Sequence, residues 1–122
     1  MSGTDRDVRL STAIVFTTNG DAMTRFYAEA LALGPPDSTM PGHVGWDLGS
    51  VYVGLDIVKE HPGAPPSAVT LWFEVPDLTA AFDHAVTHGA RPRMRPEHKP
   101  WGGFLASVLD PDGNVVGLSE RR

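Results

Sequence analysis

The pattern of apolar and polar positions predicts a strand followed by a helix near the start of the chain. The stretch RLSTAIVFTTN is rich in β-branched residues, and its alternation places Thr12, Ile14 and Phe16 on one face of a strand. The apolar positions that follow have helical spacing, at Ala22, Met23, Phe26, Tyr27, Ala30 and Leu31. They predict an amphipathic helix that begins with Asp21 as its N-cap and ends at Gly34, before two prolines.

The same order of elements returns in the second half of the chain. Residues 43–49 and 50–58 are typical of short strands with glycine turns, and the proline-rich residues 59–67 are typical of a linker. Residues 68–77 predict a new strand. Residues 77–89 predict a second amphipathic helix, with an aspartate N-cap at the start of that range and a glycine stop at its end. The pattern therefore indicates two copies of one supersecondary unit.

The end of the chain predicts a β-hairpin. Residues 90–103 are extended and rich in proline, and residues 104–120 hold two apolar runs around the turn sequence DPDGN. In the second run Val115, Gly117 and Ser119 share one face of the strand. Glycine is costly in a strand interior, so the gap that Gly117 leaves on this face requires an explanation.

The repeat and the chain length together predict one domain over residues 1–122. Its parts are a first module of about residues 8–58, the linker 59–67 and a second module of about residues 68–120. Thr12 lies seven residues before Asn19, and a predicted helix follows. Thr70 lies seven residues before Asp77, and again a predicted helix follows. The two threonines therefore hold equivalent places in the two modules.

Composition narrows the classes of protein and partner. The chain carries a net charge of −5 and contains no cysteine, which excludes disulfides, thiolate zinc sites and cysteine nucleophiles. The acidic balance disfavours nucleic acid as a partner and is compatible with a cationic small molecule. No apolar run is long enough to cross a bilayer, and the polar N-terminal residues lack the features of a signal peptide. We therefore expect a cytoplasmic protein without a membrane partner.

Three stretches resemble the vicinal oxygen chelate superfamily, which includes glyoxalases, dioxygenases and bleomycin resistance proteins. They are FYAEALALG, FEVPDLTAAFDHAVTHGA and PWGGFLASVLDPDGNVVGL. The resemblance implies an α+β fold in which two βαβββ modules form curved half-barrel sheets around a cavity, completed in a homodimer. In character the chain is closest to the bleomycin resistance proteins, which bind an antibiotic between two subunits.

The positions that hold a metal in enzymes of this superfamily carry unsuitable residues here. The resemblance places the two histidine ligands at Thr12 and Thr70, and the glutamate ligand at Gly117. A threonine hydroxyl is a poor ligand for a divalent cation, and glycine has no side chain. We therefore expect no metal, no other cofactor and no enzymatic activity. We also expect room above Gly117 for a bulky ligand that lies flat against the sheet.

The side chains expected to line the cavity are largely aromatic, which suits planar or conjugated ligands. The candidate ligand-binding residues are Phe16, His43, Trp46, Thr70, Trp72, Glu74, Trp101, Phe104 and Gly117. Glu74 supplies one charge that can pair with a cation. Trp46 and Trp72 are equally candidates for the core, whereas ligand contact is favoured for Trp101, which lies beside two glycines in a loop.

Other histidines and aspartates are better explained by solvent exposure than by a metal site. His84 and His88 are four residues apart on a predicted helix, a spacing that can bind metal. Both lie at the flank of the apolar stripe, however, so a solvated helix face is favoured. Asp47 and Asp56 have no histidine partner at a useful spacing in the sequence.

Three functions are compatible with these features. The first is non-catalytic binding of a hydrophobic or aromatic natural product by a homodimer, which would sequester an antibiotic and confer resistance. The second is a lyase, isomerase or dioxygenase with displaced metal ligands or none, in which His43, Asp47 or Glu74 supplies acid–base chemistry. The third is a protein-binding or assembly role. We favour the first, with a bleomycin-like glycopeptide, a mitomycin-like quinone or a polyaromatic or enediyne antibiotic as candidate ligand.

Overall fold

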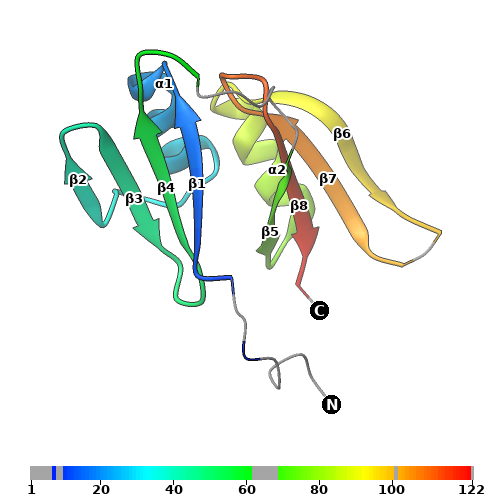
Figure 1. Ribbon diagram of the computed structural model, residues 1–122. Coiled ribbons are helices and arrows are strands. Elements are labelled where there is room, and N and C mark those ends of the chain that lie inside the picture. The colour runs from blue at the N-terminus through cyan, green and yellow to red at the C-terminus, as the bar shows by residue number, and fades with distance from the viewer. Residues whose placement is uncertain (1–6, 8–9, 62–68, 101, 122) are drawn as a thin grey trace.

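The computed structural model describes residues 7, 10–61, 69–100 and 102–121 (Figure 1). Module 1 contains β1 (Thr12–Thr17), α1 (Gly20–Arg25), the π-helix η2 (Phe26–Ala30), β2 (Ser38–Met40), β3 (His43–Asp47) and β4 (Tyr52–Ile57). Module 2 contains β5 (Leu71–Val75), α2 (Leu78–Thr87), β6 (Arg91–His98), β7 (Phe104–Leu109) and β8 (Val115–Glu120). The predicted α+β fold of two βαβββ modules is therefore confirmed.

Each module forms its own four-stranded mixed sheet. The strand orders are β1-β4-β3-β2 and β5-β8-β7-β6. In both sheets the first strand runs parallel to the last strand of its module, and the remaining neighbours are antiparallel. A parallel pair needs a long crossover, and the helical segment of each module lies within that connection. In Figure 1, β1 is the strand of module 1 that lies nearest to module 2.

The strand register places one glycine of each module at an equivalent position. Ile14 pairs with Gly54 in module 1, and Trp72 pairs with Gly117 in module 2. Ile14 and Trp72 each lie two residues beyond the threonine that the repeat makes equivalent. Gly54 is therefore the module 1 counterpart of Gly117.

One face of each sheet packs on the helices, and the other, which we call the open face, turns away from them. In β1, Val15 packs against the core, whereas Ile14 and Phe16 are each 39% exposed. In β5, Phe73 packs against the core, whereas Trp72 is 50% exposed. The largest fully buried side chains are Trp46, Tyr27, Phe82, Met23 and Leu55. The core thus lies between the sheets and the helices, and both open faces carry apolar side chains.

A buried hydrogen bond joins the two modules. Tyr27 of η2 donates its hydroxyl proton to Oδ2 of Asp110 at 2.9 Å. The Asp110 carboxylate also accepts from the backbone N–H groups of Asp112 and Asn114, which confirms the predicted turn between β7 and β8. Burial, and then the neighbouring Asp110 carboxylate, raise the pKa of Tyr27 well above its ordinary value. The turn therefore also fastens module 2 to module 1.

The first helix differs from its prediction at both ends. Its N-cap is Asn19, which makes no side-chain capping bond, and Asp21 lies within the first turn. The α-helix then widens into η2 and ends at Ala30, so the prediction of Gly34 as the stop is wrong. The N–H of Gly34 still donates to the carbonyl of Ala28 at 3.0 Å and closes the turn beyond the helix. Three of the five side chains of η2 are buried, namely Phe26, Tyr27 and Ala30, as their helical spacing predicts, whereas the widening into a π-helix is not predicted by that spacing.

In module 2 the helix has the predicted ends. The side chain of Asp77 accepts a hydrogen bond from the N–H of Ala80 at 3.0 Å, and Gly89 follows the helix with a φ of 97°. Most of the predicted linker 59–67 lies outside the described residues. Within the described part of the chain, no helix has both the length and the apolarity needed to cross a membrane.

Candidate functional site

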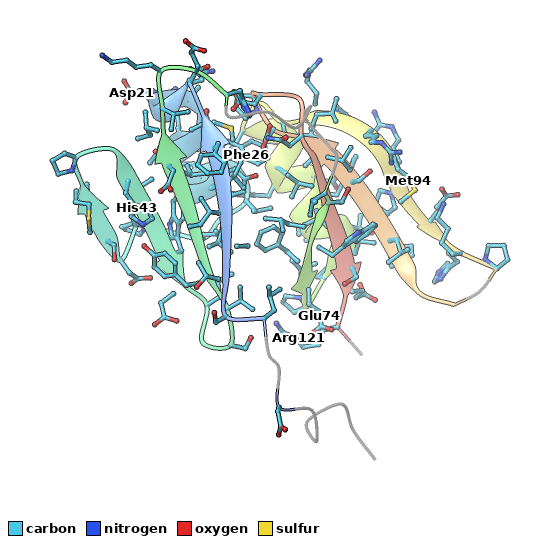
Figure 2. The ribbon with its side chains drawn as sticks, in the orientation of Figure 1. Asp21, Phe26, His43, Glu74, Met94 and Arg121 are labelled. Atoms are coloured by element: carbon cyan, nitrogen blue, oxygen red, sulfur yellow. The ribbon has the colours of Figure 1, made fainter. Side chains whose placement is uncertain are left out.

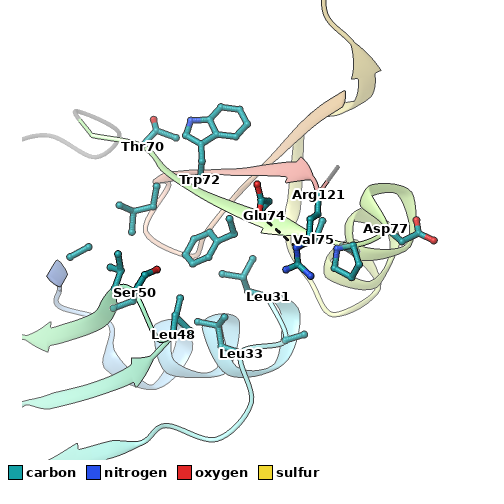
Figure 3. A pocket seen from close by; sticks show the side chains of 18 of the residues that line it. Leu31, Leu33, Leu48, Ser50, Thr70, Trp72, Glu74, Val75, Asp77 and Arg121 are labelled. Atoms are coloured by element: carbon teal, nitrogen blue, oxygen red, sulfur yellow. Dashed lines mark ion pairs between the residues drawn. The ribbon is translucent and has the colours of Figure 1, made fainter. Parts of the chain in front are cut away.

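A cleft of about 1010 Å³ opens between the two modules (Figure 3). Its lining is largely apolar, with Leu31, Leu33 and Leu48 from module 1 and Phe73 and Val75 from module 2. Ligand pockets for drug-sized molecules are commonly of this size and character. The chain therefore offers a concave apolar space at the boundary of its modules.

Three predicted site residues, Thr70, Trp72 and Glu74, lie along the module 2 side of this cleft. Figure 3 shows the indole of Trp72 on the opposite side of β5 from Leu31. Oε1 of Glu74 lies 3.7 Å from Nε of Arg121, and both side chains are exposed. An exposed ion pair at this distance contributes little stability. The Glu74 carboxylate therefore stays accessible to a cationic group.

The backbone of Gly117 is covered by the indole of Trp72. The two residues are cross-strand partners, and a Cβ atom on Gly117 would collide with the Trp72 ring. The predicted room above Gly117 is thus taken by a side chain of the protein itself, which corrects the expectation that a ligand occupies it. The outer face of the half-exposed indole remains for a planar ligand to contact.

The open face of module 1 carries a hydrogen-bonded chain of three polar side chains. Nδ1 of His43 lies 2.7 Å from Oδ1 of Asp56, and Nε2 of His43 lies 2.7 Å from the hydroxyl oxygen of Tyr52. The two rings are nearly parallel, with an interplanar angle of 11°. Tyr52 covers Gly45, and His43 covers Gly54. Figure 2 shows His43 on this sheet, and we call the three residues the polar chain.

Trp46 belongs to the core. It is 1% exposed, lies beside Tyr27 and donates its indole N–H to the carbonyl of Gly34 at 2.8 Å. Its assignment to the ligand site is therefore corrected, because its side of β3 faces the helices. The hydrogen bond to Gly34 satisfies the one polar atom of the ring, as a buried tryptophan requires.

The remaining predicted aromatic residues have different surroundings. Phe16 lies on the open face of module 1, where its cross-strand partner is Asp56. Phe104 packs against the core and stacks on His98 with ring centroids 4.3 Å apart. Trp101 lies outside the described residues.

Comparison with known protein families gives one match that spans most of the chain. The model described as the Glyoxalase/Bleomycin resistance protein/Dioxygenase superfamily matches residues 9–118. This chain belongs to that superfamily. The resemblance read from the sequence is thereby confirmed for the superfamily as a whole. No match was found among curated protein sequences.

Solved structures of the superfamily share this fold. A glyoxalase-related enzyme from Fulvimarina pelagi superposes with a TM-score of 0.80 at 17% identity, covering 93% of this chain and 88% of that one. A family enzyme from Burkholderia phytofirmans PsJN gives 0.77 at 20% identity, covering 93% and 98%. A glyoxalase/bleomycin resistance protein from Catenulispora acidiphila gives 0.72 at 21% identity, covering 94% and 100%. At these identities the likeness establishes the fold alone.

The metal positions of the superfamily's enzymes do not fit a metal in this member. Thr12, Thr70 and Gly117, the three positions that the resemblance assigns, together offer two hydroxyl groups and no carboxylate, imidazole or thiolate. Elsewhere in the described residues, no three histidine, aspartate or glutamate side chains come close enough to hold a metal ion.

The two histidines of α2 bond to backbone carbonyls. Nε2 of His84 lies 2.9 Å from the carbonyl oxygen of Glu29, and Nδ1 of His88 lies 2.9 Å from that of His84. Both side chains are exposed, but His84 also lines the cleft, and its bond to Glu29 joins α2 to η2, so only His88 agrees with the favoured interpretation of a solvated helix face.

Tyr52, Gly45 and Gly54 were not predicted as site residues from the sequence, and Asp56 was predicted to have no histidine partner. One signal was available, since the alternation of β4 places Tyr52, Gly54 and Asp56 on a single face. Their contact with His43 depends on the register between β3 and β4, which the alternation does not give.

Proposed function

We propose that this superfamily member binds a hydrophobic or aromatic natural product without transforming it, and thereby sequesters an antibiotic. The observation that carries the proposal is the half-exposed indole of Trp72, which lies over Gly117. The resemblance assigns a metal-binding carboxylate to that glycine position. A ring already seated on the sheet can stack on a planar ligand with little further loss of side-chain freedom.

The apolar character of the open faces supports the proposal. Besides Trp72, exposed apolar side chains there include Ile14, Phe16 and Met40, the last of which is 56% exposed. Apolar side chains gathered on a surface mark binding or association sites. We propose that a second copy covers them, so that module 1 of one chain and module 2 of its partner enclose the ligand. Two-fold symmetry then gives two equivalent sites per dimer.

Sequestration requires only mass action. The dissociation constant must lie well below the free drug concentration, because only then is the binding site filled with drug. Each tenfold gain in affinity requires about 1.4 kcal/mol of binding free energy. Burial of aromatic surface supplies the binding energy, and Glu74 pairs with a cationic group where the ligand carries one. Bleomycin-like glycopeptides, mitomycin-like quinones and polyaromatic antibiotics are the candidate ligands.

Calorimetric titration with bleomycin, mitomycin C and a polyaromatic antibiotic tests the proposal, with metal content measured on the same sample. We expect saturation at one ligand per chain, without stoichiometric metal, and recovery of the drug unchanged. Trp72→Ala should weaken binding about tenfold, because an aromatic contact contributes about 0.5–1.5 kcal/mol beyond its buried area. Trp72→Phe should lose less, and Val69→Ala serves as the control because Val69 is exposed but does not line the cleft.

Two results contradict the proposal. A drug recovered in altered form, with activity that depends on bound metal, favours a lyase, isomerase or dioxygenase instead. If Trp72→Ala binds the drug with unchanged affinity, the indole is not part of the binding site.

A further inference from the structure

The two hydrogen bonds of the polar chain on the open face of module 1 each have a defined donor and acceptor. An ionised carboxylate only accepts hydrogen bonds, so Nδ1 of His43, 2.7 Å from Asp56, carries a proton. In a neutral imidazole the other nitrogen then has none, and Nε2 accepts the hydroxyl proton of Tyr52 at 2.7 Å. The phenol has one proton, which is already used. Tyr52 therefore presents only lone pairs to a ligand.

The surroundings of the polar chain add negative charge and apolar walls. Asp47 is the cross-strand partner of Tyr52, and Asp56 is the cross-strand partner of both His43 and Phe16. Met40 pairs with His43 on the other side. No lysine or arginine lies on β1, β2, β3 or β4. The site thus combines hydrogen-bond acceptors and carboxylates with exposed apolar side chains.

We propose that the polar chain Asp56–His43–Tyr52 binds the hydrogen-bond-donating group of an aromatic ligand, an ammonium above all and a hydroxyl more weakly. This proposal rests on the proposed function, because it names the polar group of the ligand whose aromatic part that function requires. The Tyr52 oxygen accepts the donated hydrogen bond, and Asp56 fixes the His43 tautomer that keeps the oxygen an acceptor.

Two small probes that share a ring test the proposal on the full-length protein. They are 1-naphthylmethylamine, which carries an ammonium group, and 1-naphthaleneacetate, which carries a carboxylate. Near pH 8 we expect the amine to bind about tenfold more tightly and to shift the NMR signals of the His43 imidazole, because hydrogen bonds that involve a charged group are the stronger class.

Three variants separate the hydrogen-bonded chain from general electrostatic attraction. Tyr52→Phe keeps a ring over Gly45 and should abolish most of the preference for the amine. Asp56→Asn removes the carboxylate that fixes the tautomer and should do the same. Asp47→Asn removes an equal charge from the same face, outside the polar chain, and should change the preference by about twofold or less.

The outcomes distinguish this proposal from the one on which it rests. If the two probes bind with equal affinity near pH 8, the polar chain does not select donors, while aromatic binding stands. If Asp47→Asn lowers the preference as much as Tyr52→Phe, surface charge alone explains it and the proposal fails. If neither probe binds and the antibiotics do not bind either, the proposed function itself is contradicted.

Discussion

Three mid-strand glycines, Gly45, Gly54 and Gly117, have the same role. Each lies under an aromatic ring from the neighbouring strand, at a place where a Cβ atom would collide with that ring. Glycine in a strand interior costs about 0.5–1 kcal/mol relative to alanine. Packing of the ring on the bare backbone offsets part of that cost and holds the ring against the open face of the sheet. Orientation of open-face rings is therefore set at the scale of single residues.

Gly117→Ala tests this role without removing the tryptophan. The added methyl group should push the Trp72 indole off the sheet, because ring atoms occupy its place. We expect about tenfold weaker binding of the antibiotic identified by calorimetry, with an altered near-ultraviolet circular dichroism spectrum. Ser119→Ala, two residues along the same face, is the matched control and should leave both unchanged. An unchanged spectrum for Gly117→Ala would contradict the seating of the indole.

At the scale of elements, the two modules begin their helices differently. α2 has a side-chain cap from Asp77, and the N–H of Leu78 also donates to Glu120 at 3.1 Å. α1 has no side-chain cap, and Asp21 lies in its first turn. A polar residue lies near the start of both helices, but backbone geometry decides which side chain reaches a free N–H group.

Asp77→Ala should therefore lower the free energy of unfolding by about 1 kcal/mol, the usual cost of losing an N-cap. Asp21→Ala should cost only about 0.3 kcal/mol, because Asp21 interacts with the helix dipole alone. Urea denaturation of both variants measures the difference. Equal losses would contradict the assignment of the caps.

At the scale of the whole molecule, the bond between Tyr27 and Asp110 connects residues 83 positions apart. Tyr27→Phe removes the donor, and we expect a loss of about 1.5 kcal/mol, since hydrogen bonds to charged groups contribute about 1.5–3 kcal/mol. The lower figure applies because the amide of Asn114 still donates to Oδ2 of Asp110. Denaturant midpoints near neutral pH give this value, and a loss below about 0.5 kcal/mol would contradict the role of the bond.

The same tyrosine predicts a dependence of stability on alkaline pH. Because folding raises the pKa of Tyr27 above its ordinary value of about 10, the unfolded chain releases this proton first. The stabilisation is fully present below about pH 10 and is lost as the pH rises further. The stability of the wild type should thus fall more steeply than that of Tyr27→Phe above that pH. Parallel slopes in denaturant titrations would contradict the raised pKa.

The sequence by itself determined the order of strands and helices, the DPDGN turn and the cap of α2. Alternation, helical spacing and turn chemistry are properties of a few neighbouring residues. The replacement of metal ligands by Thr12, Thr70 and Gly117 could also be identified from the sequence, once the resemblance supplied the positions. Sequence patterns could not show which of Trp46 and Trp72 is buried, because each lies on a strand whose side chains alternate between two faces.

The tertiary structure alone decided which tryptophan faces the helices and which stays on the open face. It also brought His43, Tyr52 and Asp56 together, since their contact depends on the register of two antiparallel strands. Register is fixed by burial of one face and by packing on the helices, which involve residues distant in sequence. For that reason the fold could be read from local patterns, whereas the arrangement of its candidate site required the folded chain.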